Sequence, residues 1–256
     1  MDKQKVIFED LGLIDYKPAW EYQEFLVKKN LDIKTEARKN YSNDLEFETA
    51  TRHKLIPTVN YLLFCEHPPV YTLGRSGHPK NMLLNEHEMD ASGIRFFKTN
   101  RGGDITFHGP QQVVGYPILD LSKFFTDIGK YLRSLEEVII RTIADFGLKG
   151  DRSRGETGVW IEPGIPGRER KICAMGIRCS RWITMHGFAL NVNTDLSYFN
   201  NIIPCGLANK QVTSIEKELG NRTNFEEVKE KIKNNFENVF NVAITSLHNP
   251  LYQEVE

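Results

Sequence analysis

The sequence predicts an α/β (α+β) fold, in which helices flank a mixed β-sheet. The chain has 256 residues, 40% of them hydrophobic, which is enough for a substantial core. Strand-like and helical stretches are interspersed, and several strand-like runs follow one another between helices. This order favours a mixed sheet over a doubly wound parallel sheet. No repeat, low-complexity tract or Gly/Ser-rich linker divides residues 1–256, so we expect a single domain.

The first half of the chain reads as a strand, a long helix and then a series of strands. Residues 6–12 (VIFEDLG) are typical of a strand, and a helix is expected over 18–40, because proline is tolerated in a first helical turn. Residues 34–58 are polar and charged, which predicts the helix end and a surface loop. The apolar runs that follow predict strands at 60–67, 69–75, 94–100, 104–109 and 112–121.

The second half begins with a strongly periodic helix. Hydrophobic residues three or four positions apart predict a helix over 127–146, followed by Gly147 as a C-cap. Strands are expected at 157–163 and along the apolar run 171–193. A last helix is expected from about 223, where Thr223 and Glu226 fit a capping box.

Composition argues against several classes of protein. The formal net charge of −1 predicts no bulk attraction to nucleic acid or to an anionic membrane. No apolar run approaches the roughly 20 residues of a membrane-spanning helix. The N-terminal stretch has no apolar segment typical of a signal peptide, which predicts a cytoplasmic protein. The sequence has no HExxH, GxxxxGK[ST] or GxGxxG motif, so it indicates neither a metal nor a nucleotide cofactor.

The four cysteines, Cys65, Cys173, Cys179 and Cys205, form no C-x-x-C pair. In a chain of this length and expected location, disulfides are not predicted. Two of these cysteines lie near His186 in the sequence, but their spacing fits no usual zinc site.

The segment RGGDITFHGPQQ, residues 101–112, is the densest cluster of residues suited to ligand contact. Its two glycines predict a turn where backbone lies close to a ligand, with Arg101 and Asp104 on either side. Two interpretations stay open: a tight surface turn with an ion pair, or the wall of a binding site. His108 and His186 each precede a glycine, so two strands ending in His-Gly could meet at one pocket, although a lone histidine is more often structural.

Lys171 begins the apolar run KICAMG. In a regular strand, Lys171, Cys173 and Met175 share one face. The lysine is then either a solvated residue where a loop joins a strand, or an ammonium pointing into a site with apolar walls.

Cys205 lies between Pro204 and Gly206. Proline fixes the backbone before the cysteine and glycine permits a sharp turn after it, which a core cysteine does not need. Free cysteine is nevertheless among the most buried residue types, so a small core side chain is the alternative. A lysine near this thiol would stabilise the thiolate or accept its proton and so make a nucleophile for acyl transfer. Glycine-rich turns can supply N–H groups for the oxyanion that forms.

Five motifs, taken together and in this order, resemble the octanoyltransferases of lipoic acid biosynthesis, the LipB-type lipoyl(octanoyl) transferases. The similarity spans about residues 6–215, nearly the whole chain. The motifs are HPPVYTLGR (67–75), RGGDITFHGPQQVVGYPILDL (101–121), TGVW (157–160), KICAMGIRCSRWITMHGFALNVNTDL (171–196) and IIPCGL (202–207).

This resemblance implies the catalytic-domain fold of biotin and lipoate protein ligases. It also implies transfer of octanoyl from octanoyl-acyl-carrier-protein to a lysine ε-amino group, through a cysteine thioester and without a cofactor. The implied acceptors are the lipoyl domains of 2-oxoacid dehydrogenase E2 subunits and the glycine cleavage H protein. Cys205 matches the family's nucleophile and Lys171 its partner lysine. The residues that match the family's substrate contacts are Arg101, Gly102, Gly103, Asp104, Ile105, Thr106, Phe107, His108, Ala174, Met175, Gly176, Gly187, Phe188 and Ala189.

The sequence departs from the family pattern at a few places. Gln111 occupies a position where glycine is usual, and Cys173 stands where alanine is usual and is a potential competing thiol. Segments 34–58 and 162–170 look longer than in the family, and we interpret both as surface elaborations.

Other functions remain open at this level. An ATP-dependent lipoate or biotin ligase would share the glycine-rich turn and the lysine but would not need Cys205. A thioesterase would use water in place of the acceptor amine, and a non-catalytic carrier-binding module would need neither residue. Residues 149–181 hold more Lys and Arg than Asp and Glu, which predicts either steering of an acidic carrier protein or only a solvated surface.

Overall fold

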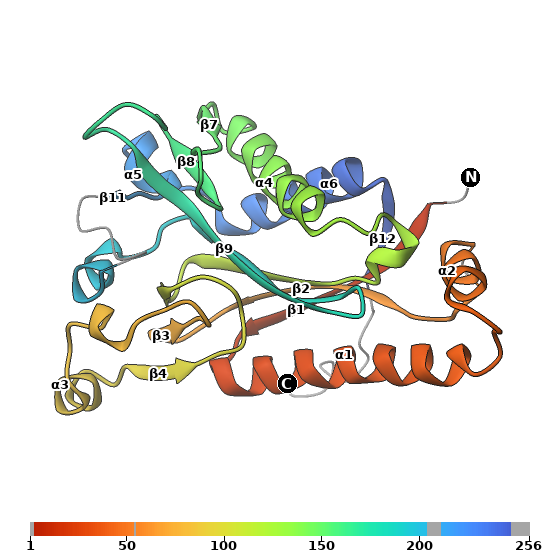
Figure 1. Cartoon of the computed structure of the whole chain (residues 1–256). Helices are drawn as coiled ribbons and strands as arrows, with labels where there is room; N and C mark the ends of the chain where they lie inside the picture. Colours follow the sequence, from red (N-terminus) through yellow and green to blue (C-terminus); the bar gives the residue numbers. More distant parts are fainter. Residues whose placement is uncertain (1–2, 54, 204–210, 247–256) are drawn as a thin grey trace, which may run out of the picture.

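The computed structural model describes residues 3–53, 55–203 and 211–246 and confirms a mixed sheet flanked by helices. In these ranges a nine-stranded sheet runs in the order β12-β1-β2-β6-β10-β9-β8-β7, with β11 paired to β9 (Figure 1). The pairs of β1 with β12 and β2, and of β11 with β9, are parallel, and the other pairs are antiparallel. The strands are β1 (Gln4–Leu13), β2 (Asn60–Glu66), β6 (Gln112–Ile118), β7 (Gly150–Asp151), β8 (Val159–Ile161), β9 (Arg170–Ser180), β10 (Ile183–Asn191), β11 (Gln211–Val212) and β12 (Val242–Ser246).

A smaller sheet in the order β4-β3-β5 lies beside the large one. Its connection from β4 to β5 carries residues 101–104, and β5 itself carries residues 105–108. Its strands are β3 (Val70–Leu73), β4 (Arg95–Lys98) and β5 (Ile105–His108).

Helices cover both faces of the large sheet (Figure 1). Helices α4 and α6 pack together over one face, while the long helix α1 lies under the other face against β10 and β6. The helices are α1 (Tyr16–Arg38), α2 (Asp44–Arg52), α3 (Glu86–Ala91), α4 (Ile128–Ala144), α5 (Ile215–Leu219) and α6 (Phe225–Phe240), with short 3-10 helices η1 (Pro79–Asn81), η2 (Leu121–Lys123) and η3 (Leu196–Asn201). No helix in the described ranges has both the length and the apolar character needed to cross a bilayer.

Each layer has its own hydrophobic core. The α4/α6 face is held by a cluster that includes Leu135, Ile139 and Phe236, all fully buried. The α1 face has a second cluster, and the small sheet a third one, in which Phe107 packs with Phe199. Burial of apolar surface stabilises the fold by roughly 25 cal/mol per Å². The three clusters therefore fix the small sheet and the two helix layers against the central strands.

Two local expectations were wrong. Residues 44–52 form helix α2 and not a loop, because the Asn43 side chain caps this short polar helix by accepting from the Glu46 N–H. Helix α6 is capped by Asn224, whose side chain accepts from the N–H groups of Glu226 and Glu227, so Thr223 is not the N-cap.

The apolar run 171–193 is a hairpin of β9 and β10. Its two turn residues, Arg181 and Trp182, both have positive φ, at 46° and 68°. Such a turn usually carries Asn or Gly, and neither is present to signal it in the sequence. Because β10 continues to Asn191, the strand does not end at His186, contrary to our expectation.

Candidate functional site

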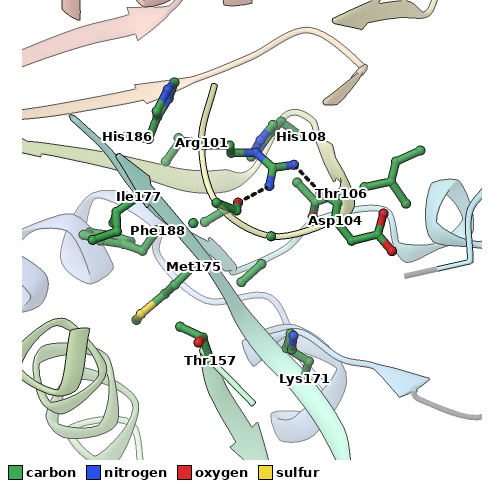
Figure 2. A pocket seen from close by; sticks show the side chains of 18 of the residues that line it. Arg101, Asp104, Thr106, His108, Thr157, Lys171, Met175, Ile177, His186 and Phe188 are labelled. Carbon is green, nitrogen blue, oxygen red and sulfur yellow. Dashed lines mark hydrogen bonds between the residues drawn. The ribbon is translucent and has the colours of Figure 1, made fainter. Parts of the chain in front are cut away.

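A cavity of about 330 Å³ lies between the small sheet and the β9–β10 hairpin (Figure 2). Below we call it the acyl cavity, after the acyl transfer that the sequence resemblance implies. Lys171 lines it, together with every residue that the sequence matched to substrate contact except Phe107. Phe107 is 1% exposed and belongs to the third core, with its ring stacked on Tyr198 at a centroid distance of 4.6 Å. The matched lining residues are 101–106, 108, 171, 174–176 and 187–189.

Cys205 lies outside the described residues, within 204–210. The described chain on both sides of that segment reaches the acyl cavity, because Phe199 and Val212 line it. Val212 also pairs with Lys171 in the parallel ladder between β11 and β9.

The guanidinium of Arg101 stabilises the turn that contains it through hydrogen bonds to backbone carbonyls. It donates to the backbone carbonyls of Gly102 and Asp104, at 2.9 and 2.8 Å (Figure 2). It also donates to the carbonyl of Thr72 in β3, at 2.6 Å. Its charge is therefore directed at backbone dipoles and not at the carboxylate of Asp104. That carboxylate instead accepts from the Asn81 side chain at 2.6 Å.

The turn is pressed against strand β9. The N–H of Gly102 donates to the carbonyl of Ile177 at 2.8 Å. A Cβ at Gly176 would lie 2.6 Å from the Gly102 carbonyl oxygen, and a Cβ at Gly74 would lie 2.3 Å from that of Gly103. Glycine is needed at both positions because two backbones meet there. The wall formed by residues 101–108 is thus locked between β3 and β9.

Three buried histidines surround this wall and are neutral. Burial lowers the pKa of His67 to about 4 and those of His108 and His186 to about 3. His108 and His186 both line the acyl cavity, as expected for one shared pocket. The ring of Tyr16, from helix α1, stacks on the ring of His108, with 6.0 Å between the ring centroids.

A chain of hydrogen bonds joins the two sides of the cavity. The Gln112 side chain accepts from His108 Nδ1 at 2.9 Å and donates to Asn191 Oδ1 at 2.8 Å. Asn191 donates to the carbonyl of Thr213 at 2.9 Å, and the N–H of Thr213 donates to the carbonyl of Lys171 at 2.9 Å. His108 and the backbone of Lys171 therefore belong to one network.

Lys171 lies on the opposite wall, with its Nζ 4.6 Å from the centroid of the Trp160 ring. Figure 2 shows Lys171 and Thr157 at the end of the cavity away from His186. Gly158 has a φ of 113°, and a Cβ there would lie 2.4 Å from the carbonyl oxygen of Cys173 and 3.7 Å from Cε of Lys171. The 155–158 segment therefore packs directly against the Lys171 side chain. Together with Lys171 it forms the wall that we call the lysine wall.

Cys173 does not share a face with Lys171, contrary to the regular alternation we expected. Val159 pairs with Cys173 while Trp160 pairs with Lys171, so Ile172 is the extra residue of a β-bulge. Cys173 is 0% exposed in the α4/α6 core, and burial raises the pKa of its thiol. A buried, protonated thiol is a poor competitor for an acyl group.

Gln111 adopts the turn that glycine usually makes. Its φ is 61°, and its carbonyl accepts from the N–H groups of Val192 and Asn193, at 3.3 and 3.1 Å. Its side-chain oxygen accepts from Asn193 Nδ2 at 2.8 Å and from Arg222 at 3.1 Å. These bonds hold the left-handed conformation, so the departure from the family pattern leaves the turn in place.

The basic residues of 149–181 do not form one continuous patch. Arg170 pairs with Glu218 at 2.5 Å and with Glu162 at 2.6 Å. Arg178 pairs with Glu24 of helix α1 at 3.0 Å, on the other face of the sheet.

Sequence reasoning missed residues that reach the cavity from distant elements. Tyr16 comes from helix α1, Leu132 from helix α4 and Tyr116 from strand β6. Nothing in their local patterns separates them from ordinary core residues, because only the packing of the layers brings them to one place. In the described ranges, no group of three His, Cys, Asp or Glu residues is arranged to hold a metal ion.

Comparison with known proteins agrees with this arrangement. Residues 15–237 match the family model described as the lipoyl protein ligase A/B catalytic domain. The chain is 54% identical over 242 residues to an octanoyltransferase of Christiangramia forsetii, covering 94% of this chain and 98% of that protein. It is 56% identical over 242 residues to an octanoyltransferase of Flavobacterium johnsoniae, covering 94% of this chain and 99% of that protein.

Solved structures share the fold at low sequence identity. The bipartite lipoate protein ligase of Thermoplasma acidophilum superposes with a TM-score of 0.64 at 14% identity, over 96% of this chain and 87% of that one. A lipoate-protein ligase A bound with ATP also gives a TM-score of 0.64, at 11% identity, over 97% of this chain and 90% of that one.

Proposed function

Because the chain belongs to the octanoyltransferases of the lipoyl protein ligase A/B family, and is thus an acyltransferase, we propose the following reaction for it. The enzyme takes octanoyl from octanoyl-acyl-carrier-protein and forms a thioester on Cys205. It then passes the acyl group to the ε-amino group of a lysine on a lipoyl domain. The proposed acceptors are the lipoyl domains of 2-oxoacid dehydrogenase E2 subunits and the glycine cleavage H protein.

The observation that carries this proposal is the acyl cavity itself. Its volume of about 330 Å³ suits a small ligand, since ligand sites typically measure roughly 300–1,000 Å³. Met175, Ile177 and Phe188 supply apolar surface, and Lys171 supplies an amino group at the far end (Figure 2). An acyl chain can lie along the apolar side with its carbonyl carbon toward the lysine.

The first chemical step is an exchange of one thioester for another. The Cys205 thiolate attacks the carbonyl carbon of the donor, an oxyanion forms, and the carrier thiolate leaves with a proton. An ordinary thiol with a pKa of about 8.5 is only a few per cent thiolate at neutral pH. Lys171 is the proposed group that either stabilises the thiolate or accepts its proton.

The second step forms the amide. The acceptor amine attacks the carbonyl carbon of the acyl-enzyme, a second oxyanion forms, and the Cys205 thiolate leaves. The amine loses a proton, which restores the thiol, so no cofactor is consumed. Both steps need positioned donors for the oxyanion.

The test of this proposal is the intact mass of the protein after mixing with octanoyl-acyl-carrier-protein in the absence of ATP. We expect a single octanoyl adduct, located on Cys205 by peptide mapping, and its transfer to a lipoyl domain that is added afterwards. An adduct on Cys173, or no adduct on any cysteine, contradicts the proposed nucleophile. A strict need for ATP would favour a ligase, and stable binding without an adduct would favour a carrier-binding module.

A further inference from the structure

A second hollow, of about 500 Å³, adjoins the acyl cavity. Residues 155–157 of the lysine wall line both, so the two hollows meet at this segment. The rest of the second hollow is lined by Arg133, Arg152, Ser153 and Arg154. We call it the arginine hollow.

A buried carboxylate holds two of these arginines in place. Glu136 of helix α4 is 0% exposed and pairs with Arg133 at 2.7 Å and with Nε of Arg152 at 3.1 Å. Its other oxygen accepts from the N–H of Gly158 at 3.0 Å. Arg152 also donates to Glu137 at 2.9 Å. The guanidinium groups are thereby oriented relative to the same segment that packs on Lys171.

The arginines keep donors for a ligand. In the described part of the chain, Arg152 uses Nε and NH2 but not NH1 in these bonds, and Arg133 pairs through NH1. Arg154 is exposed and makes no hydrogen bond or ion pair with the described residues. Glu156 also lines the hollow, so the lining has three arginines and one glutamate. Glu136 and Glu137 offset much of the positive charge of the arginines. The hollow therefore offers a ligand oriented N–H donors, and its net positive potential is the smaller contribution.

We propose that the arginine hollow binds the phosphate of the arm that carries the donor's acyl thioester. This inference rests on the proposed function, because a carrier protein holds its thioester on a pantetheine arm that is joined to the carrier through a phosphodiester. With the acyl chain in the acyl cavity, the arm leaves along residues 155–157 toward the arginines. Guanidinium groups suit this ligand because their planar forks match two oxygens of a phosphate at once.

The test compares octanoyl-phosphopantetheine with octanoyl-pantetheine as donors, which differ only in the phosphate. We expect the wild-type enzyme to show a kcat/KM ratio of about tenfold in favour of the phosphorylated donor, the effect of one charge-assisted contact. In Arg154→Gln this ratio should fall toward one. Arg141→Gln is the matched control, because Arg141 pairs with Glu137 on the same helix and lines neither cavity, and it should keep the wild-type ratio.

Binding of phosphopantetheine and of pantetheine by calorimetry gives a second readout that does not depend on transfer. A ratio near one in the wild type, or a ratio that persists in both Arg154→Gln and Arg133→Gln, overturns the phosphate site and leaves the proposed function intact. Selective, Arg154-dependent binding of phosphopantetheine without any octanoyl transfer supports the site and contradicts the proposed function. Melting curves of each variant identify any loss of folding.

Discussion

The two walls of the acyl cavity use positive charge differently. In the wall of residues 101–108, Arg101 is 8% exposed and its guanidinium is bonded to backbone carbonyls and to Thr72. In the lysine wall, the Lys171 side chain lines the cavity and its Nζ lies over the Trp160 ring. The comparison teaches that the Arg101 guanidinium serves to shape the cavity, whereas the facing wall carries the amino group to which we assign the proposed chemistry.

The largest expected effect is on catalysis and comes from the lysine wall. Lys171→Met keeps much of the aliphatic stem but removes the charge and the base. We expect acyl-enzyme formation to slow by roughly 10²- to 10⁴-fold, the usual contribution of acid–base assistance. The measurement is the rate of adduct formation across pH, with a melting curve that should match the wild type.

Lys171→Arg then separates charge from proton transfer. Arginine keeps the positive charge but stays protonated, so it cannot accept a proton. Partial recovery of the rate indicates that charge is what matters, and no recovery indicates proton transfer. A near-wild-type rate in Lys171→Met would remove Lys171 from the mechanism and erase the contrast between the walls.

A substitution of Arg101, in the wall of residues 101–108, should reduce the stability of the protein. Arg101→Gln removes a donor from the buried carbonyl of Thr72 and from that of Asp104, which keeps only the bond from the Gly74 N–H. We expect a loss of about 3 kcal/mol in the free energy of unfolding, measured by chemical denaturation. Arg95→Gln is the control, since Arg95 is 61% exposed in its ion pair with Asp15 and should lose at most about 1 kcal/mol. Equal losses in the two variants would refute the structural role of Arg101.

The neutral histidines predict a pH dependence of stability. Their pKa values are lowered, to about 4 for His67 and about 3 for His108 and His186, so they stay neutral in the folded protein while the unfolded chain protonates them below about pH 6.5. The unfolded state therefore binds more protons as the pH falls. Stability should drop between pH 6.5 and 5 by about 2 kcal/mol for each histidine.

Denaturation at several pH values tests this expectation. His67→Gln should reduce the loss between pH 6.5 and 5, whereas His87→Gln, on the exposed surface of helix α3, should leave it unchanged. An unchanged pH dependence in His67→Gln would contradict the assignment of a neutral buried ring.

The smallest effect on stability and on octanoyl transfer is expected at Gln111, which follows the wall of residues 101–108 in the chain. Gln111→Gly relieves the strain of a positive φ but loses the side-chain bonds to Asn193 and Arg222. These effects oppose each other, so the free energy of unfolding should change by less than about 1 kcal/mol. Octanoyl transfer should also stay within about twofold of the wild type. A large loss in either measurement would mean that the turn depends on the glutamine.

The strongly periodic segments were predictable. The expected helix at 127–146 is α4, Ile128–Ala144, because its apolar residues recur with the helical period and pack as one stripe on the sheet. Three of the five motifs, 101–121, 157–160 and 171–196, contribute residues to the lining of one cavity, because both hairpin strands and the small sheet border it. The described residues of the motifs 67–75 and 202–207 do not line it. What escaped prediction depends on contacts between elements. The bulge at Ile172, the Arg181–Trp182 turn and the approach of Tyr16 to the cavity have no local signature.

The hydrogen-bond chain from His108 through Gln112 and Asn191 to the Lys171 backbone has a consequence for engineering and for sequence divergence. Substitutions at Gln112 and Asn191 are coupled, because the side chain of each has both its donor and its acceptor committed within the chain. The two residues should therefore show non-additive effects in a double-mutant cycle, since removing either one takes a hydrogen-bond partner from the other. A new acyl specificity introduced in one wall of the cavity must be selected together with compensating changes in the facing wall.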